Sequence, residues 1–403
     1  MAERQVAYLN HAATAWPRAE GVGQVVASWI ERTPGAVARG TDGGDSEMDA
    51  GRMIGRLRRR LAGLLGVSDA DRVVLAGGGT DAANVGIHAV LDGGSGHAVV
   101  TAADHNAIQR PLEQRVAEGG LALTRVGVDG QGRVDPLAVG EAVQAETRLV
   151  AVTHGSNVTG AVNDVAAVVT AVRRAWERIG AGAEPPWVMV DAAQTAGVVP
   201  IDVEGWGVDL LVVSAHKGLG GVPGLGALLL GKRLAEAGRL RPMRSGGTGD
   251  SSSRLQPERL PERLEAGTPN VPGLAGWDHA LGVLGEVCEW AADLERELGW
   301  LDRARAGLSA EGADVYAADV GTPRLPTLSF RLPGWEVQEL GAVLAEPFGV
   351  VTRAGVHCSP DVHEALGTAP EGLVRVSLGR TTTAEEVDAL VRAIRELAGA
   401  GVG

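Results

Sequence analysis

The residue whose setting most strongly suggests chemistry is Lys217, which lies in the run Ser-Ala-His-Lys-Gly at positions 214–218. It follows an apolar stretch over 210–213 that predicts a buried strand, and a glycine-rich turn comes after it. A lysine amine that is desolvated shifts its pKa readily and can form a Schiff base. The alternative is a lysine whose long side chain reaches solvent. Other residues at the same sheet edge decide between the two.

Three polar residues follow other predicted strands at the point where each strand ends. Asp191 follows 187–190, His105 comes shortly after 98–101, and Asn157 after 149–152. A carboxylate facing a protonated pyridine nitrogen would strengthen a cofactor's electron sink. An imidazole could stack on a planar ring or move protons, and the amide could bind a carboxylate or a ring hydroxyl. The alternatives are structural. Asp191 could be a buried carboxylate paired with another group, His105 a polar residue in a loop, and Asn157 part of a turn.

A glycine run at 77–79, followed by Thr80, lies between a predicted strand and a predicted helix. Glycines there let backbone N–H groups approach an anion, and a helix N-terminus favours phosphate. The alternative is a simple helix cap. Neither a Walker A loop nor a dinucleotide-binding glycine pattern is present.

Cys358 lies in a loop between Arg353 and Pro360, directly after His357. Basic neighbours on a loop that contains Gly and ends at Pro are the surroundings that lower a thiol pKa and expose the thiol. The alternative is a structural cysteine, which is how we interpret Cys288 in its helical run.

The bulk composition limits the classes of function. A chain of 403 residues exceeds what one core usually supports, so we expect two domains. The net charge of −13 argues against general nucleic-acid binding, and the basic run at 56–60 fits a solvated helix face. No stretch is apolar for long enough to span a membrane, and residues 1–6 lack the apolar core of a signal peptide.

The number of cysteines indicates a cellular compartment and argues against a structural metal site. Two cysteines make a disulfide framework implausible and predict a cytoplasmic, reducing location. Because no paired-cysteine spacing exists, we expect no structural zinc site.

Short apolar runs alternate with helical patterns through the first two thirds of the chain. This predicts a mostly parallel sheet covered by helices on both faces, with ligands at the C-terminal strand ends. Residues 245–273 have no clear periodicity, and a helix is predicted from Gly276 to Leu308. The predicted strands are 72–75, 98–101, 149–152, 187–190 and 210–213, and the predicted helices include 80–91, 165–179 and 384–397.

Together these runs resemble the cysteine desulfurase-like group of class V aminotransferases, which are fold-type I enzymes dependent on pyridoxal 5'-phosphate. The resemblance covers nearly the whole chain and depends on an ordered set of motifs. It implies a large domain over 18–262 with a mostly parallel, seven-stranded type of sheet. It also implies a smaller α+β domain formed by 1–17 and 263–403. The motifs are Asn-His-Ala-Ala-Thr (10–14), Ser-Asn-x-x-Gly (156–160), Asp-x-Ala-Gln (191–194), Ser-x-His-Lys (214–217), Glu-Ala-Gly-Thr-Pro-Asn (265–270), Arg-x-Gly-x-His-Cys (353–358) and Arg-Val-Ser (375–377).

The resemblance implies a role for each matching residue. Lys217 resembles the Schiff-base lysine that also moves protons, Asp191 the pyridine-nitrogen partner and Gln194 the donor to the ring hydroxyl. His105 resembles the residue stacked on the ring and a possible general acid or base. A homodimer is implied, because Thr268 would complete the phosphate cup of a neighbouring subunit. The other implied phosphate-cup residues are Gly79, Thr80, Ser214 and His216, and the implied substrate-binding residues are Arg375, Arg353, Asn157 and Ala13.

The resemblance therefore implies a cysteine desulfurase or C–S lyase that forms alanine from cysteine and passes the sulfur to Cys358 as a persulfide. A sulfur-acceptor protein is a possible further partner. One alternative is a lyase with the same cofactor that acts on another amino acid or a cysteine conjugate. The other is a non-catalytic sulfur-transfer partner that keeps the fold. The chain departs from the usual family pattern at 10–13, at 79–81 and at 220–224.

Overall fold

The larger of the sheets has seven strands in the order β2-β8-β7-β6-β5-β3-β4. The computed structural model describes residues 6–31, 45–91, 95–180, 184–248, 254–285 and 287–400. All strands of this sheet run parallel except β8, which is antiparallel to both of its neighbours. The strands are β2 (Val73–Ala76), β3 (His97–Thr101), β4 (Ala122–Val126), β5 (Thr147–Thr153), β6 (Trp187–Asp191), β7 (Leu210–Ser214) and β8 (Gly226–Leu230).

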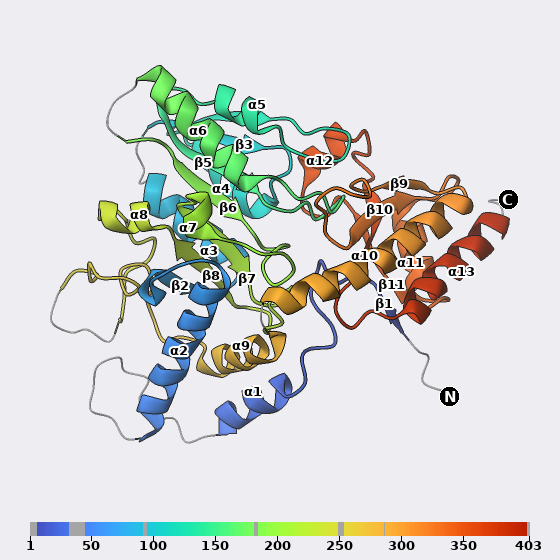
Figure 1. The fold of residues 1–403 in the computed structure, drawn as a ribbon, viewed down its shortest axis with the longest axis horizontal. Helices are drawn as coiled ribbons and strands as arrows, with labels where there is room; N and C mark the ends of the chain where they lie inside the picture. Colours follow the sequence, from blue (N-terminus) through green and yellow to red (C-terminus); the bar gives the residue numbers. More distant parts are fainter. Residues whose placement is uncertain are drawn as a thin grey trace.

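Both faces of this sheet are buried, as the near-continuous apolar strands predict. Leu211 and Val213 of β7 pack into one core, and Leu210 and Val212 pack into the core on the opposite face. Figure 1 shows helices on both sides of the sheet. The helices on the first side are α1 (Val22–Glu31), α2 (Asp45–Leu64), α5 (Pro136–Glu141), α6 (Val165–Ile179), α7 (Val203–Trp206) and α9 (Val271–Leu284), and those on the second are α3 (Gly79–Leu91), α4 (Asn106–Ala117) and α8 (Lys232–Ala237).

Local sequence signals set the helix boundaries well where caps are present. The Asp164 side chain accepts a hydrogen bond from the Ala167 N–H at 2.9 Å and so begins α6. Gly180, at φ 63°, ends the same helix in the left-handed conformation that glycine adopts easily. The helix thus covers the predicted range 165–179.

The C-terminal part of the chain forms a second, smaller unit, and the N-terminal segment packs with it. An antiparallel sheet has the order β12-β13-β10-β9, and β1 pairs in parallel with β11. Leu9 packs with Phe330 and Ile394 in the core of this part, and Figure 1 shows β1 beside the C-terminal elements. The elements are β1 (Ala7–Tyr8), α10 (Val287–Ala310), β9 (Asp314–Tyr316), β10 (Thr327–Arg331), α11 (Val337–Ala345), β11 (Val350–Val351), β12 (Arg353–Gly355), α12 (Pro360–Ala365), β13 (Leu373–Ser377) and α13 (Ala384–Ala400).

The structure differs from the sequence-based prediction in several elements. The helix predicted over 276–308 is two helices, α9 and α10, separated at Gly285, where the backbone has φ 77° and ψ −169°. β4 and β8 escaped prediction: β4 lies at the sheet edge and is only partly buried, and β8 directly follows a glycine-rich turn. The described residues of 245–270 form turns and bends rather than helix or strand.

The division into domains at 262/263 stays a proposal, and α9 is the segment that bears on it. α9 packs against α1 and α2, and its side chains, including Trp277 and Leu281, belong to the core of the larger sheet. α9, although it follows residue 263, thus packs with the larger sheet.

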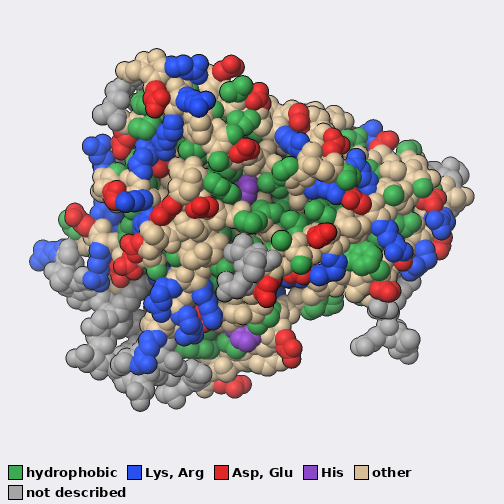
Figure 2. All heavy atoms as spheres, viewed as in Figure 1, with side chains coloured by type: hydrophobic (Ala, Val, Ile, Leu, Met, Phe, Trp, Pro, Cys, Tyr) green, Lys and Arg blue, Asp and Glu red, His purple; other side chains and the backbone are tan. Residues whose placement is uncertain are grey.

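In the described part of the chain, no helix is both long and apolar enough to cross a membrane. The face drawn in Figure 2 has basic and acidic side chains interspersed rather than gathered by sign. Among the described residues, no group of three or more His, Cys, Asp or Glu side chains is placed to hold a metal ion.

Candidate active site

A cavity of about 360 Å³ opens at the C-terminal ends of the central strands, and we call it the strand-end cavity. It lies where β5, β6 and β7 end and where α3 and α4 begin, which is the edge at which open α/β sheets bind ligands. Most of the predicted site residues meet there. Those that line it are Gly79, Thr80, His105, Asn157, Asp191, Gln194, Ser214, His216 and Lys217.

Lys217 and Asp191 are brought together because β6 and β7 are neighbours in the sheet. Enclosure by protein lowers the pKa of the Lys217 ammonium from 10.5 to about 8. The Asp191 carboxylate opposes this shift, while the charges of Arg375 and Arg353 add to it. Asp191 accepts a hydrogen bond from the Ala193 N–H on Oδ1 at 2.9 Å. The lysine can therefore be neutral, and thus nucleophilic, close to neutral pH.

His105 is the N-cap residue of α4, and a hydrogen bond to its ring fixes its tautomer. Its Nδ1 accepts a hydrogen bond from the Ala107 N–H at 3.0 Å, so the neutral ring carries its proton on Nε2. Burial lowers the pKa of His105, against the effect of the Asp191 carboxylate. A neutral imidazole at the cavity wall suits stacking on a planar ring.

The proposed phosphate cup combines a helix N-terminus with the end of β7. α3 begins at Gly79, next to Thr80, where the first N–H groups of a helix have no partner within it. Gly79 lies beside Ser214, because a Cβ on Gly79 would be in ordinary van der Waals contact with the Ser214 Cβ, at 3.4 Å. Both face the strand-end cavity.

His216, the third side of this cup, is held by the N-terminal segment. Its Nδ1 lies 3.0 Å from the Thr14 hydroxyl, and its carbonyl accepts the Arg18 Nη1–H at 2.9 Å. Burial lowers the pKa of His216 to about 4, and the charge of Lys217 adds to the effect. The neutral ring is a hydrogen-bond donor or acceptor toward the cup and carries no charge.

The loop that carries Cys358 has an unusual backbone. His357 and Cys358 have φ values of 53° and 61°, in the left-handed region that non-glycine residues rarely adopt. Asn157 Nδ2 donates to the His357 carbonyl at 2.7 Å, Ser359 Oγ donates to Asn157 Oδ1 at 2.9 Å, and the Asn106 N–H donates to the Cys358 carbonyl at 2.8 Å. These bonds hold the loop beside the strand ends.

The Cys358 thiol lies near two arginines. Arg353 Nη2 is 3.3 Å from the Cys358 Sγ. Arg353 pairs in register with Arg375 across β12 and β13. The Arg353 guanidinium can therefore donate a hydrogen bond to the Cys358 sulfur.

Arg375 is 1% exposed, and no Asp or Glu of the described residues forms an ion pair with it. Its Nη1 donates to the Asn157 carbonyl at 3.1 Å and its Nη2 to Asn10 Oδ1 at 3.0 Å, while Nε has no partner. Burial lowers the pKa of Arg375 to about 9, and Arg353 adds to the effect. A buried guanidinium without a carboxylate partner suits an anionic ligand, because fork-like pairing with a carboxylate would satisfy it.

Two residues near the site had been assigned no role from the sequence. Asn10, in the N-terminal motif, orients Arg375. Asp104 is fully buried beside His105 and accepts the Thr101 N–H at 2.7 Å. Burial raises the pKa of Asp104 to about 7, although the hydrogen bond from Thr101 opposes this.

Five predicted residues do not line the strand-end cavity: Cys358, Arg353 and Arg375 are connected to it through Asn157, and the other two are Ala13 and Thr268. Ala13 donates its N–H to the Asn10 carbonyl at 3.0 Å in a turn, whereas its neighbour Ala12 accepts the Gln194 Nε2–H at 3.0 Å. Thr268 is exposed and directly follows a bend at Gly267. The substrate role of Ala13 and the cross-subunit role of Thr268 stay predictions.

Comparisons with known proteins agree with this geometry. The Aminotransferase class-V family model matches residues 7–390. A cysteine desulfurase of Frankia sp. (strain EuIK1) is 32% identical over 418 residues, which cover 96% of this chain and 91% of that protein. Human selenocysteine lyase is 30% identical over 381 residues, covering 85% and 82%. A crystal structure of the cysteine desulfurase CsdA (S-sulfonic acid) from Escherichia coli has a TM-score of 0.84 at 26% identity, covering 98% and 96%.

The chain belongs to the class V aminotransferase family, a family of enzymes that depend on pyridoxal phosphate. The predicted family, fold class and cofactor are thereby confirmed. The residues that line the strand-end cavity have the chemical groups that this cofactor requires. It offers an amine of lowered pKa, a carboxylate beside it, an imidazole at the wall and a helix N-terminus for a phosphate.

Proposed function

We propose that this protein is a cysteine desulfurase that converts cysteine to alanine and collects the sulfur on Cys358 as a persulfide. The observation that carries the proposal is the placement of the Cys358 thiol, 3.3 Å from Arg353 Nη2, on a loop fixed to the strand-end cavity by Asn157. The cysteine desulfurases among its relatives support it.

In this proposal each residue acts at a stated atom. Arg375 binds the substrate carboxylate, and Lys217 Nζ removes the proton from the substrate Cα. With the cofactor bound, Asp191 would pair with its ring nitrogen, Gln194 would donate to its ring hydroxyl and His105 would stack on its ring. Pyridoxal phosphate, when bound, supplies the electron sink that accepts the electron pair left at Cα.

The sulfur step belongs to Cys358. Its thiolate attacks the substrate Sγ, so a new S–S bond forms while the substrate's Cβ–Sγ bond breaks. The electron pair of that bond stays with the carbon part of the substrate, which takes up protons at Cβ and at Cα and leaves as alanine. Covalent capture of sulfur divides one difficult step into two easier ones.

The decisive experiment compares substrates on the holoenzyme. We expect cysteine to give alanine and protein-bound sulfur in equal amounts, and selenocysteine and cystine are run alongside it. In Cys358→Ala, sulfur release from cysteine should fail although the cofactor stays bound. Full-rate sulfur release by Cys358→Ala would instead favour a lyase that acts on another amino acid or a cysteine conjugate.

We further propose a cytoplasmic homodimer that passes its sulfur to an acceptor protein. Thr268 lies exposed and away from the cavity of its own chain, which is where a residue that serves a partner subunit must lie. Thr268→Ala should weaken cofactor retention without disturbing the site of its own subunit. Tight cofactor binding by a demonstrated monomer would contradict the dimer proposal.

A further inference from the structure

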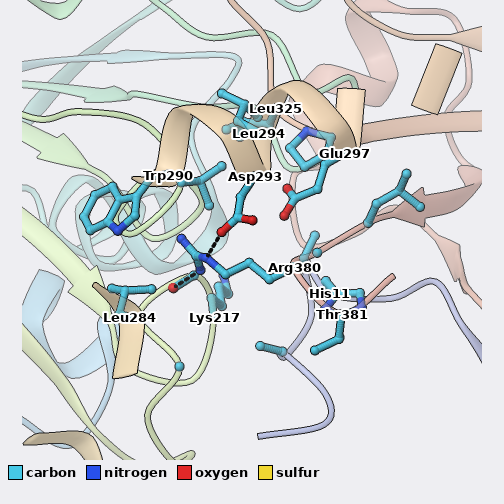
Figure 3. A pocket seen from close by; sticks show the side chains of 18 of the residues that line it. His11, Lys217, Leu284, Trp290, Asp293, Leu294, Glu297, Leu325, Arg380 and Thr381 are labelled. Carbon is cyan, nitrogen blue, oxygen red and sulfur yellow. Dashed lines mark hydrogen bonds and ion pairs between the residues drawn. The ribbon is translucent and has the colours of Figure 1, made fainter. Parts of the chain in front are cut away.

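A second cavity, of about 260 Å³, lies on the other side of Lys217, and we call it the α10 cavity. Figure 3 shows it between the turn that carries Lys217, the N-terminal segment at His11, and α10. Its walls are mainly apolar, with Leu284, Leu294 and Leu325 among them. Its volume lies just below the range of about 300–1,000 Å³ that is typical of small-molecule sites, so it would suit a small ligand.

Glu297 gives this cavity a specific chemical feature. It lies on α10 four residues after Asp293, so both carboxyl groups project from the same helix face. Glu297 is 4% exposed and forms no hydrogen bond or ion pair with any described residue. Figure 3 shows its carboxyl group turned toward the cavity. Because no described protein group satisfies this carboxyl, its partner must be water or a ligand in the cavity.

The cation nearest to this carboxyl is already engaged. Arg380 donates from Nε to Asp293 at 3.1 Å and from Nη1 to the Gly218 carbonyl at 3.1 Å, and its Nη2 bonds the Gly197 carbonyl. Burial raises the pKa of Glu297 to about 7, which Arg380 opposes and Asp293 reinforces. An anionic ligand would meet two carboxyl groups and an occupied guanidinium, whereas a cation or a strong hydrogen-bond donor would find a partner.

We propose that the α10 cavity is a binding site for a small organic amine, whose ammonium group pairs with Glu297 while its apolar body packs among Leu284, Leu294 and Leu325. The cavity touches the catalytic centre, because Lys217 and Gln194 line both this cavity and the strand-end cavity. The residues that would bind the amine, Glu297 and the three leucines, are not among those that carry the proposed desulfuration, so either proposal can fail without the other.

The test measures binding to the holoenzyme by isothermal titration calorimetry. The probe is N,N-dimethylbenzylamine, a tertiary amine that cannot form a Schiff base with the cofactor. We expect saturable binding at millimolar concentration, at least about tenfold weaker in Glu297→Gln, as the loss of one charge-assisted hydrogen bond predicts. Glu396→Gln, which removes an exposed carboxyl group from α13, should bind as the wild type does.

A second variant and two matched ligands keep the test decisive if Glu297→Gln is unstable. Leu284→Trp should fill the cavity from its rim and abolish binding. Benzyl alcohol and benzoate, which have the same ring without the ammonium group, should bind at least about tenfold more weakly than the amine, for the same reason. No saturable binding of the amine, equal binding by Glu297→Gln, or equal binding of benzoate would each overturn the proposal.

Discussion

The two sides of the active site are built in different ways. Lys217, Asp191 and Ser214 lie at or just after the ends of buried parallel strands, so the sheet itself fixes their spacing. Cys358 lies instead on a loop whose backbone is in the left-handed region and which depends on hydrogen bonds from Asn157, Asn106 and Ser359. The sheet therefore holds the side of the site that contains Lys217 and Asp191, whereas a few hydrogen bonds hold the side that contains Cys358.

The largest effect is expected on the sheet side, in Lys217→Ala. Loss of the amine removes the attachment of the cofactor, and the loss of proton transfer at Cα alone costs about 100- to 10,000-fold in rate. The absorbance of the lysine-bound cofactor should disappear. The measurement is the visible spectrum together with alanine formation, and retention of both would refute the role of Lys217.

On the loop side, Cys358→Ala should separate sulfur chemistry from cofactor binding. We expect the visible spectrum to stay as in the wild type while alanine formation from cysteine falls by about 100-fold or more, since loss of a nucleophile commonly costs at least that much. Cys288→Ala is the matched control, and its rate should be unchanged. A large loss of cofactor in Cys358→Ala would show that the two sides are not independent.

Asn157→Ala should loosen the loop without touching the thiol. The change leaves the Ser359 hydroxyl and the His357 carbonyl without partners, which costs about 1–3 kcal/mol of stability for each buried group. Because small displacements of reacting groups are costly, we expect the rate to fall by about 10- to 100-fold. Alanine formation and thermal unfolding measure the two effects, and a wild-type rate in Asn157→Ala would refute the loop's dependence on this amide.

The smallest effect concerns the pH dependence of cofactor attachment to the apoprotein. Only the neutral amine reacts, and the pKa of Lys217 is lowered to about 8. The rate should therefore rise with pH up to about 8 and then level off, rather than continue toward 10.5. In Asp191→Asn the midpoint should move to lower pH, because the Asp191 carboxylate raises the pKa of Lys217. Stopped-flow absorbance measures this rate. An unchanged midpoint in Asp191→Asn would show that Asp191 does not influence the pKa of Lys217.

The difference between the two sides also explains what could be predicted from the sequence. Near-continuous apolar runs mark parallel strands, and the polar residues after them meet at one edge, so Lys217, Asp191 and His105 were placed in one cavity. The predicted role of Asn157, binding a carboxylate or a ring hydroxyl, stays a prediction; in the structure its amide Oδ1 and one amide N–H also hold the cysteine loop, which was not predicted. Such pairs join residues about 200 positions apart, and no local pattern reports them.

The orientation of Arg375 by Asn10 escaped prediction for the same reason, because the two residues are 365 positions apart. The break between α9 and α10 depends on Gly285, a single residue inside an otherwise helical pattern. Cofactor-side chemistry thus follows from local sequence, whereas the positioning of the sulfur side depends on tertiary contacts.

The central claim is that sulfur leaves the substrate on Cys358. A single turnover of the holoenzyme with cysteine, stopped by alkylation and followed by mass spectrometry of the peptide that contains Cys358, tests it directly. We predict one added sulfur atom on Cys358, in an amount equal to the alanine formed, and none on Cys288. Alanine formed together with free sulfide, while Cys358 stays unmodified, would contradict it.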